Sequence, residues 1–376
     1  MNARVLKRLL FQAVLLAAVG GLFVAAFVNA RGNLEARGIP TSFGFLSNVA
    51  GFGLNQSLIP YSPLSSYARA LLVGLLNTLL VSVLAGIFAS VVGFAAGFAR
   101  LSGHWALAKL AMLYVETVRN IPLLLQLLFW YVAILAPLPG PDRSLSLPGV
   151  LFNNRGLNLP ALTFEPGALW VGLAAIAAAV LAPTWRRHAR IAPPRGLATL
   201  LIVAGLPLAA FFAFDRPIGL DLPAYDASIN RYNVEGGLRL PPEIFALVLA
   251  LSLYTGSYIA EIVRAGVNSV ARGQSEASAA LGLTSAQARK LVIVPQAMRI
   301  IMPPLISQYL ALAKNSSLAA FIGFADLMQV SGTILNQTGA AVQVIALDMA
   351  IYLSLSLATL AILRLYERRF SWGAQR

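Results

Sequence analysis

Long apolar runs separated by short polar segments dominate this chain. A helix needs about 20 apolar residues to cross a membrane, and eight runs reach or approach that length. The first has about 22 residues, more than the apolar region of a signal peptide, and we expect a retained helix. The pattern predicts an all-α polytopic membrane protein. Its expected spans are about 9–30, 70–98, 107–136, 168–183, 196–214, 243–267, 300–323 and 341–363.

The composition narrows the class further. Of the 376 residues, 58% are hydrophobic and 11% are charged, whereas soluble domains carry about 25% charged residues. The net charge of +14 does not indicate nucleic-acid binding, because the basic residues stand at the ends of apolar runs and form no basic patch with interleaved aromatics. Cysteine is absent, which excludes disulfides, thiolate metal sites and cysteine nucleophiles.

The charges at the span ends predict the orientation. With a cytoplasmic N-terminus, the cytoplasmic segments hold 19 of the 28 Lys and Arg residues, the opposite side holds 8, and Lys314 lies within a span. Because Lys and Arg accumulate on the cytoplasmic side of membrane proteins, we expect both termini in the cytoplasm.

A short polar hairpin separates the sixth and seventh runs. The Ala-rich segment 276–281 predicts a helix, and Gly282 predicts a left-handed cap at its end. Thr284 and Gln287 fit a capping box at the start of a second helix. That helix is expected to end near Pro295, with the adjacent prolines 303 and 304 at the entry to the seventh span. On these residues alone, the hairpin is either an amphipathic connector or a docking element for another protein.

This segment closely resembles the EAA loop of ABC importer permeases. Glu276-Ala-Ser is followed by Gly282 six residues after the glutamate and by Pro295 nineteen residues after it. Ser278 stands where the family usually has a second alanine. In that family the loop is the coupling helix, which inserts into a groove on the ATP-binding subunit. The resemblance assigns this contact to Gln274, Glu276, Ala277, Ser278, Gly282 and Leu283.

The resemblance extends over nearly the whole chain. Residues 114–126, 254–264 and 314–318 resemble the second, third and fourth core helices of polar amino-acid permeases. Together with 33–38 and 335–339, they are similar to one of the two permease subunits of broad-specificity L-amino-acid importers of Gram-negative bacteria, more to the Q subunit than to its M partner. The resemblance implies a type I ABC importer transmembrane domain: a five-helix core plus an N-terminal helix and an inserted two-helix hairpin.

On that basis the chain divides into four parts. Residues 1–68 hold the N-terminal span and a periplasmic loop with a candidate interfacial helix, and 69–136 hold the first two core spans. Residues 137–242 hold periplasmic loops and the inserted hairpin 168–214. The loop at about 137–167 is rich in Pro and Gly and is expected to be an exposed connection. Residues 243–376 hold the remaining core spans and the cytoplasmic coupling loop 268–299. We expect the inserted hairpin to be peripheral, because neither of its helices has a polar residue inside.

The resemblance also implies partners and substrates. It implies a heterodimer with a second homologous permease, two copies of an ATP-binding subunit and a periplasmic amino-acid-binding protein, in the bacterial inner membrane. The cargo would be polar L-amino acids, including Glu, Gln, Asp and Asn, moved from periplasm to cytoplasm by alternating access. The chain itself is expected to bind no cofactor and to be no enzyme: none of its lysines follows a glycine, so it has no P-loop. ATP and Mg would belong to the partner ATPase.

Two other classes of function are less favoured. A secondary amino-acid transporter, working without an ATPase partner, would need inverted repeats and paired broken helices, and the sequence shows neither. A membrane-embedded enzyme would need a metal set or a nucleophile–base arrangement, yet the two histidines, His104 and His188, both lie beside predicted cytoplasmic charges.

Polar residues within the spans are candidates for the transport path. Lys314 lies about 15 residues into the seventh span, and a charge at that depth usually faces a cavity or a partner. It either attracts a substrate carboxylate or forms a buried ion pair with Asp348 or Glu261. For Glu261 and Arg264, three apart on one helix face, a local ion pair is favoured over substrate contact, and Glu116, Arg119 and Gln126 have similar status. The candidate path residues are Gln126, Tyr254, Ser257, Glu261, Lys314, Asn315 and Ser316.

Overall fold

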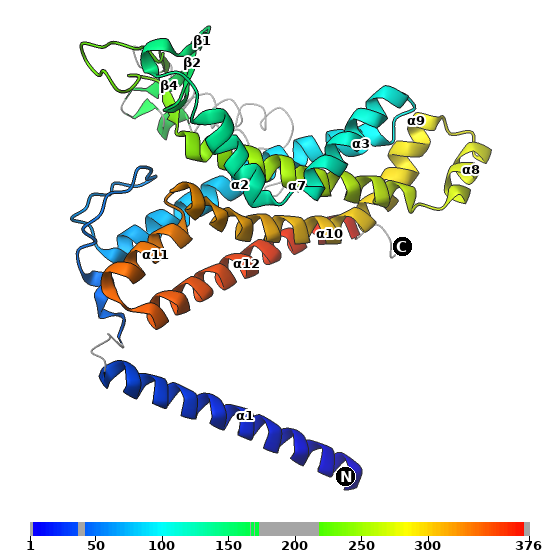
Figure 1. Cartoon of the computed structure of the whole chain (residues 1–376). Helices are drawn as coiled ribbons and strands as arrows, with labels where there is room; N and C mark the ends of the chain where they lie inside the picture. The colour runs from blue at the N-terminus through cyan, green and yellow to red at the C-terminus, as the bar shows by residue number, and fades with distance from the viewer. Residues whose placement is uncertain (1–2, 37–41, 166, 169, 173–217, 372–376) are drawn as a thin grey trace, which may run out of the picture. The chain divides into compact units, whose positions relative to one another are not determined.

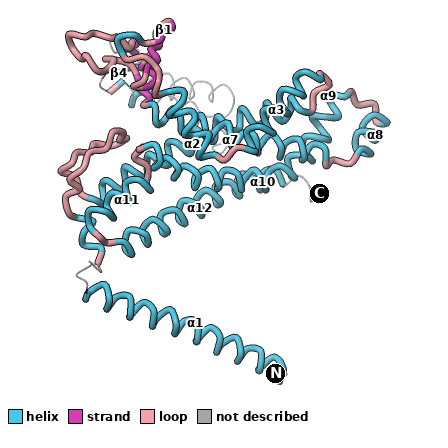
Figure 2. The backbone as a smooth tube through the Cα atoms, viewed as in Figure 1, coloured by secondary structure: helices cyan, strands magenta, loops and turns pink. Residues whose placement is uncertain are grey.

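The structure is a computed structural model that describes residues 3–36, 42–165, 167–168, 170–172 and 218–371, and these are mainly helical (Figures 1 and 2). Among them, five helices are long and apolar enough to cross a membrane, and a bent helix pair can form a sixth span. These six correspond to the six predicted runs that fall in described residues. The predicted hairpin at 168–214 lies almost wholly outside them.

Helices alternate with short helical segments and strands along the described part of the chain. The α-helices are α1 (Ala3–Ala36), α2 (Tyr67–Arg100), α3 (Trp105–Asn120), α4 (Leu123–Leu128), α7 (Pro242–Asn268), α8 (Arg272–Ala280), α9 (Ser285–Ala288), α10 (Val294–Asn315), α11 (Leu327–Thr338) and α12 (Ala341–Ser371). The 3₁₀ segments are η1 (Phe43–Ser47), η3 (Pro141–Arg143) and η5 (Ser316–Ile322), and the π segments are η2 (Phe129–Leu135) and η4 (Arg289–Ile293). The strands are β1 (Leu145–Leu147), β2 (Val150–Asn153), β3 (Gly156–Leu159), β4 (Ala161–Phe164), β5 (Ile218–Asp221) and β6 (Leu238–Leu240).

Contacts divide the chain into a helical unit, residues 1–130 and 246–376, and a β-containing unit, residues 131–245. In the helical unit, α2 packs closely against α7 because glycines remove side chains from the contact. A Cβ atom on Gly93 would lie 2.5 Å from Cβ of Ile259, and one on Gly97 would lie 2.8 Å from Cβ of Val263. Small residues at such positions let membrane helices approach one another, so these two helices form a fixed pair.

Helix α11, which the sequence did not predict, is anchored on α2 by buried polar groups. The carboxylate of Asp326 caps it by accepting a hydrogen bond from the Gln329 N–H at 2.9 Å. From α2, the Thr78 hydroxyl accepts from the Leu327 N–H at 3.0 Å, and the Asn77 amide donates to the Ala325 carbonyl at 2.8 Å. An interfacial helix was expected within 31–68; in the described residues 42–66 of that loop, the helical segment is the five-residue η1.

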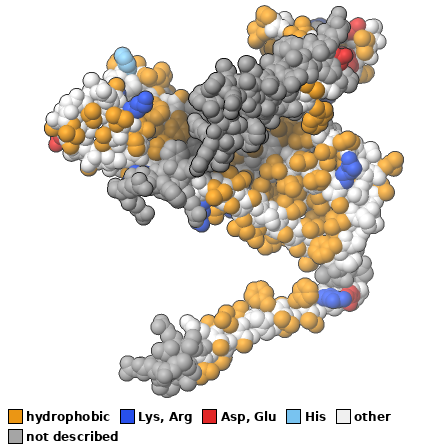
Figure 3. All heavy atoms as spheres, turned by 180° about the vertical axis from the view of Figure 1, so that it is seen from behind, with side chains coloured by type: hydrophobic (Ala, Val, Ile, Leu, Met, Phe, Trp, Pro, Cys, Tyr) orange, Lys and Arg blue, Asp and Glu red, His pale blue; other side chains and the backbone are white. Residues whose placement is uncertain are grey.

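Apolar side chains are exposed along the long helices, as a lipid-facing surface requires. Phe88 and Val91 of α2 are 52% and 64% exposed, and Leu353 of α12 is 61% exposed. Seen from behind, apolar side chains predominate on the described surface, with few charges among them (Figure 3). The apolar window of α1 is not buried at all within the chain.

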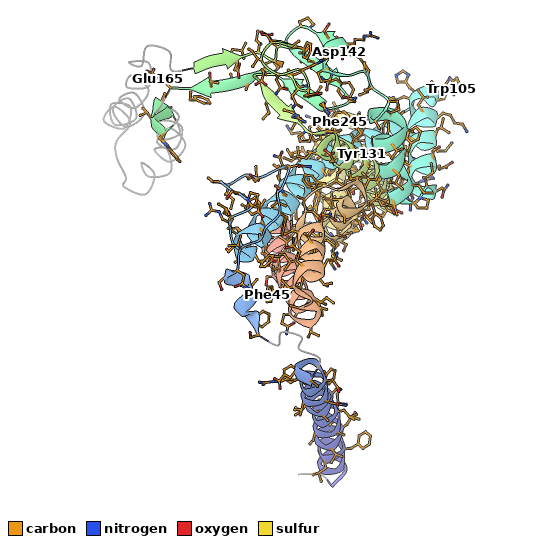
Figure 4. All side chains as sticks on the ribbon, turned by 60° about the vertical axis from the view of Figure 1, so that its left-hand side comes forward. Phe45, Trp105, Tyr131, Asp142, Glu165 and Phe245 are labelled. Carbon is orange, nitrogen blue, oxygen red and sulfur yellow. The ribbon has the colours of Figure 1, made fainter. Side chains whose placement is uncertain are left out.

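The β-containing unit corrects the prediction that residues 137–167 are only an exposed connection. Strands β1, β2, β3 and β6 form an antiparallel sheet in that order, and β4 pairs with β5. The rings of Phe152 and Phe245 lie 5.6 Å apart, and the Tyr131 hydroxyl donates to Glu243 at 3.1 Å. Tyr131 and Phe245 mark the two ends of this unit in Figure 4. The strands escaped prediction because each has only three or four residues, too few to show an alternating pattern.

Candidate functional site

The polar hairpin, residues 272–293, has the predicted helix–glycine–helix form. Helix α8 ends before Gly282, whose φ of +75° is left-handed. Two hydrogen bonds close the turn, from the Gly282 N–H to the Ala279 carbonyl at 2.9 Å and from the Leu283 N–H to the Ser278 carbonyl at 3.1 Å. A Cβ atom added to Gly282 would meet no neighbouring atom within 4 Å. The glycine is therefore needed for its backbone conformation and not for space.

The start of the second helix is also as predicted. The Thr284 hydroxyl accepts from the Gln287 N–H at 3.3 Å, and the Gln287 side chain accepts from the Thr284 N–H at 2.9 Å. This reciprocal pair is the capping box. Across the hairpin, the Gln296 amide donates to the Gln274 amide at 2.8 Å. The hairpin is thus closed at its turn and at its base.

The residues assigned to the coupling contact do not all face outward. Ser278 is 2% exposed and donates to the Gln274 carbonyl at 2.6 Å, so it packs inside the hairpin. Leu283 is half-buried, whereas Glu276 and Ala277 are exposed. Leu281, which sequence reasoning omitted, is 80% exposed at the turn. The signal available in the sequence was a leucine directly before the glycine expected at the turn. A leucine at a turn of a polar hairpin indicates a contact surface.

The second helix does not end near Pro295, as the sequence had suggested. The chain remains helical through α9, η4 and α10, and Pro303 and Pro304 lie inside α10. Each proline removes one N–H donor but has a φ that a helix accepts. The π segment η4 lies directly before Val294 and Pro295. The hairpin is therefore continuous with a membrane-spanning helix, and the two prolines do not mark its start.

Gln126 lies at a break in the third described span. Helices α3 and α4 meet at an angle of 105° around Ile121 and Pro122, where a residue before proline disfavours helix. The Gln126 amide is buried and donates to the carbonyls of Val118 and Ile121 at 2.8 and 2.9 Å. Its amide nitrogen thus satisfies two backbone groups that the break releases, as membrane helices require.

Two of the candidate serines are buried and bond to their own helices. Ser257 donates to the Tyr254 carbonyl at 2.6 Å, and Ser316 donates to the Ala313 carbonyl at 2.9 Å. Tyr254 is half-buried, and its hydroxyl lies 3.2 Å from that of Tyr258. Tyr254 therefore presents a polar group outward from α7, whereas the hydroxyls of the two serines are directed to the backbone.

Glu261 forms the local ion pair with Arg264 that was favoured from the sequence, at 2.5 Å. It also accepts a hydrogen bond from Arg100 at the end of α2. Arg119 of α3 lies 4.0 Å from the same carboxylate, and its guanidinium lies 4.9 Å from the centre of the Tyr258 ring. Sequence reasoning missed this meeting of three helices. Tyr254, Tyr258 and Glu261 recur at helical spacing, which places them on one face.

Neither proposed counter-charge pairs with Lys314. Glu261 is occupied by arginines, and Asp348 accepts a hydrogen bond from Ser331. Lys314 is exposed and Asn315 is half-buried. No acidic side chain in the described part of the chain lies within 4.0 Å of the Lys314 ammonium group. An intramolecular ion pair with either residue is therefore not formed.

Apolar spanning helices with a capped polar hairpin between two of them place the chain in the class of polytopic membrane proteins. The model of the family described as binding-protein-dependent transport system inner membrane component matches residues 89–372, and the chain belongs to this family.

Curated relatives cover most of the chain. It is 47% identical over 335 residues to the general L-amino acid transport system permease protein AapQ of Rhizobium johnstonii, covering 87% of this chain and 83% of that protein. It is 41% identical over 390 residues to the glutamate/glutamine/aspartate/asparagine transport system permease protein BztB of Rhodobacter capsulatus, covering 92% of this chain and 90% of that protein. The alternative of a secondary transporter finds no support among these relatives.

Proposed function

We propose that this chain is a permease subunit that carries polar L-amino acids, including glutamate, glutamine, aspartate and asparagine, from periplasm to cytoplasm, driven by ATP hydrolysis on a separate subunit. The names of the two relatives support this substrate class. The working complex contains a second homologous permease, two ATP-binding subunits and a periplasmic amino-acid-binding protein. Both termini of this chain are cytoplasmic, in agreement with its Lys and Arg distribution.

The polar hairpin is the observation that carries the proposal. It is rigidly closed by the left-handed Gly282, by the capping box and by the Gln274–Gln296 bond. Its turn exposes Leu281 (80%), and Leu291 of the same hairpin is also exposed (61%). Apolar side chains that are exposed in the free protein and surrounded by polar residues can form the buried centre of an interface. We assign this surface to the ATP-binding subunit, and the helical continuity into α10 lets that subunit move a membrane span.

Co-purification tests the proposal. The tagged chain, produced with the candidate permease and ATPase partners, should retain both after detergent extraction. The complex should hydrolyse ATP faster with substrate-loaded binding protein, and vesicles containing it should take up labelled L-glutamate only with internal ATP. Uptake by the chain alone, driven by an ion gradient, would instead establish a secondary transporter.

A matched pair of variants locates the ATPase contact. Leu281→Asp should reduce ATPase recovery about tenfold or more, because loss of a buried interface anchor costs about 2 kcal/mol or more. Leu64→Asp is the control, since Leu64 is 83% exposed and lies in the loop before α2, outside the hairpin. Equal ATPase recovery with both variants would place the contact elsewhere.

A further inference from the structure

We propose that Arg119, Tyr254 and Tyr258 form a binding site for the α-carboxylate and α-ammonium groups of the transported amino acid. This inference rests on the proposed function. It differs from the set expected from sequence, in which Glu261 and Lys314 supplied the two charges. The site lies where α3 meets α7, which the Tyr114 hydroxyl joins by donating to the Leu253 carbonyl at 2.7 Å (Figure 1).

The charges around Glu261 do not balance. Arg100 and Arg264 both donate hydrogen bonds to its carboxylate. Arg119 lies 4.0 Å from it, too far for a hydrogen bond. In the described part of the chain, no other acidic group lies within ion-pair distance of these three arginines. Among the described residues, two positive charges therefore remain uncompensated where α2, α3 and α7 meet.

Arg119 is the arginine that is free to bind an anion. Its side chain is 38% exposed, against 13% for Arg100. No hydrogen bond to a described residue uses its side-chain N–H donors. The Tyr258 ring, 4.9 Å from the guanidinium carbon, holds it in place. A guanidinium positioned in this way can bind a carboxylate through two parallel N–H···O bonds.

The adjacent tyrosines suit the ammonium group. The rings of Tyr254 and Tyr258 lie 5.0 Å apart, with their hydroxyls 3.2 Å apart. When one hydroxyl donates to the other, the donor oxygen keeps its lone pairs for an ammonium N–H. Aromatic faces also attract cations. The carboxylate and the ammonium of one α-amino acid thus meet complementary groups on neighbouring helices, and the excess positive charge favours acidic substrates.

Uptake by the reconstituted complex gives the first test. Arg119→Gln should lower L-glutamate uptake about tenfold or more, since hydrogen bonds to charged groups are strong. Arg119→Lys, which keeps the charge but loses the planar fork, should lose less. Lys109→Gln removes an exposed cation from the same helix and should retain uptake. Uptake by Arg119→Gln within twofold of the unmodified complex would overturn the site.

Protection of a cysteine separates binding from assembly. The chain has no cysteine, so Glu116→Cys, on an exposed position one turn before Arg119, introduces a single thiol. L-Glutamate should slow its modification by a thiol reagent, and 4-aminobutyrate, which lacks the α-carboxylate, should not. Protection should disappear in the Glu116→Cys, Arg119→Gln double variant.

Each remaining outcome decides the question. If Arg119→Gln fails to assemble, the test is protection of the Glu116→Cys thiol by L-glutamate in the complex that retains Arg119. A lack of protection there overturns the site. Protection by anionic phospholipid in place of glutamate would assign Arg119 to a lipid headgroup and also overturn it. If the unmodified complex takes up no amino acid, the proposed function fails. If it transports and Arg119 is dispensable, only this site fails.

Discussion

Replacement of Gly282 should uncouple the hairpin from ATP hydrolysis without removing the protein from the membrane. The φ of +75° at Gly282 is left-handed, and no neighbouring atom would touch a new Cβ. The whole effect is thus backbone strain, which costs about 1–2 kcal/mol for a residue with a Cβ. Since about 1.4 kcal/mol is tenfold in an equilibrium, the correct turn should become about 5- to 30-fold less populated relative to other conformations. A β-branched residue should be worst.

The assay is ATPase activity of the reconstituted complex with substrate-loaded binding protein. Gly282→Ala should lower the stimulated rate and Gly282→Val should lower it further, with unchanged amounts of chain in the membrane. Gly273→Ala is the matched control: it lies in helix α8 of the same hairpin, also without neighbours within 4 Å, and alanine there favours the helix. Normal stimulation in Gly282→Val would refute the reasoning that turn shape transmits the motion.

Two further predictions concern the membrane helices. Gly93→Ala should destabilise the purified permease by about 1–3 kcal/mol, because the added Cβ would lie 2.5 Å from Ile259. Gly86→Ala is the control and should leave the melting temperature unchanged, because its Cβ would have no neighbour closer than 3.9 Å. Equal melting temperatures for the two variants would contradict the α2–α7 contact. Lys314→Met should leave the melting temperature of the permease unchanged, since Lys314 forms no ion pair with a described residue. A lower melting temperature or a loss of assembly would show a structural role instead.

The sequence predicted features that depend on local chemistry. Six spans followed from apolar length, and the hairpin followed from Gly282, Thr284 and Gln287, each of which acts on its own backbone. Helix α11 could not be predicted in the same way. It follows the membrane span after a short turn, and the groups that fix its start, Asn77 and Thr78, lie about 250 residues earlier in the chain.

Contacts between different helices of the candidate transport path could not be predicted from the sequence either. Spacing alone identified the Glu261–Arg264 pair, but not Arg100, which reaches Glu261 from another helix. It also offered no means of distinguishing a serine that bonds to its own backbone, such as Ser257, from one that faces a cavity. The prolines at 303 and 304 suggested a boundary because proline disfavours helix interiors, yet they lie within α10.

The uninterrupted helical course from Ser285 to Asn315 gives the polar hairpin a mechanical connection to the membrane interior. At about 1.5 Å per residue, it extends about 45 Å, with the hairpin at one end and Lys314 near the other. Its bending stiffness is uneven, because Pro303 and Pro304 remove the donors for the carbonyls of Arg299 and Ile300. A force on the hairpin would therefore be transmitted through the first turns of α10 as through a rigid rod. At Pro303 and Pro304 it would change the angle of the helix, so that the half of α10 after the prolines tilts and need not slide.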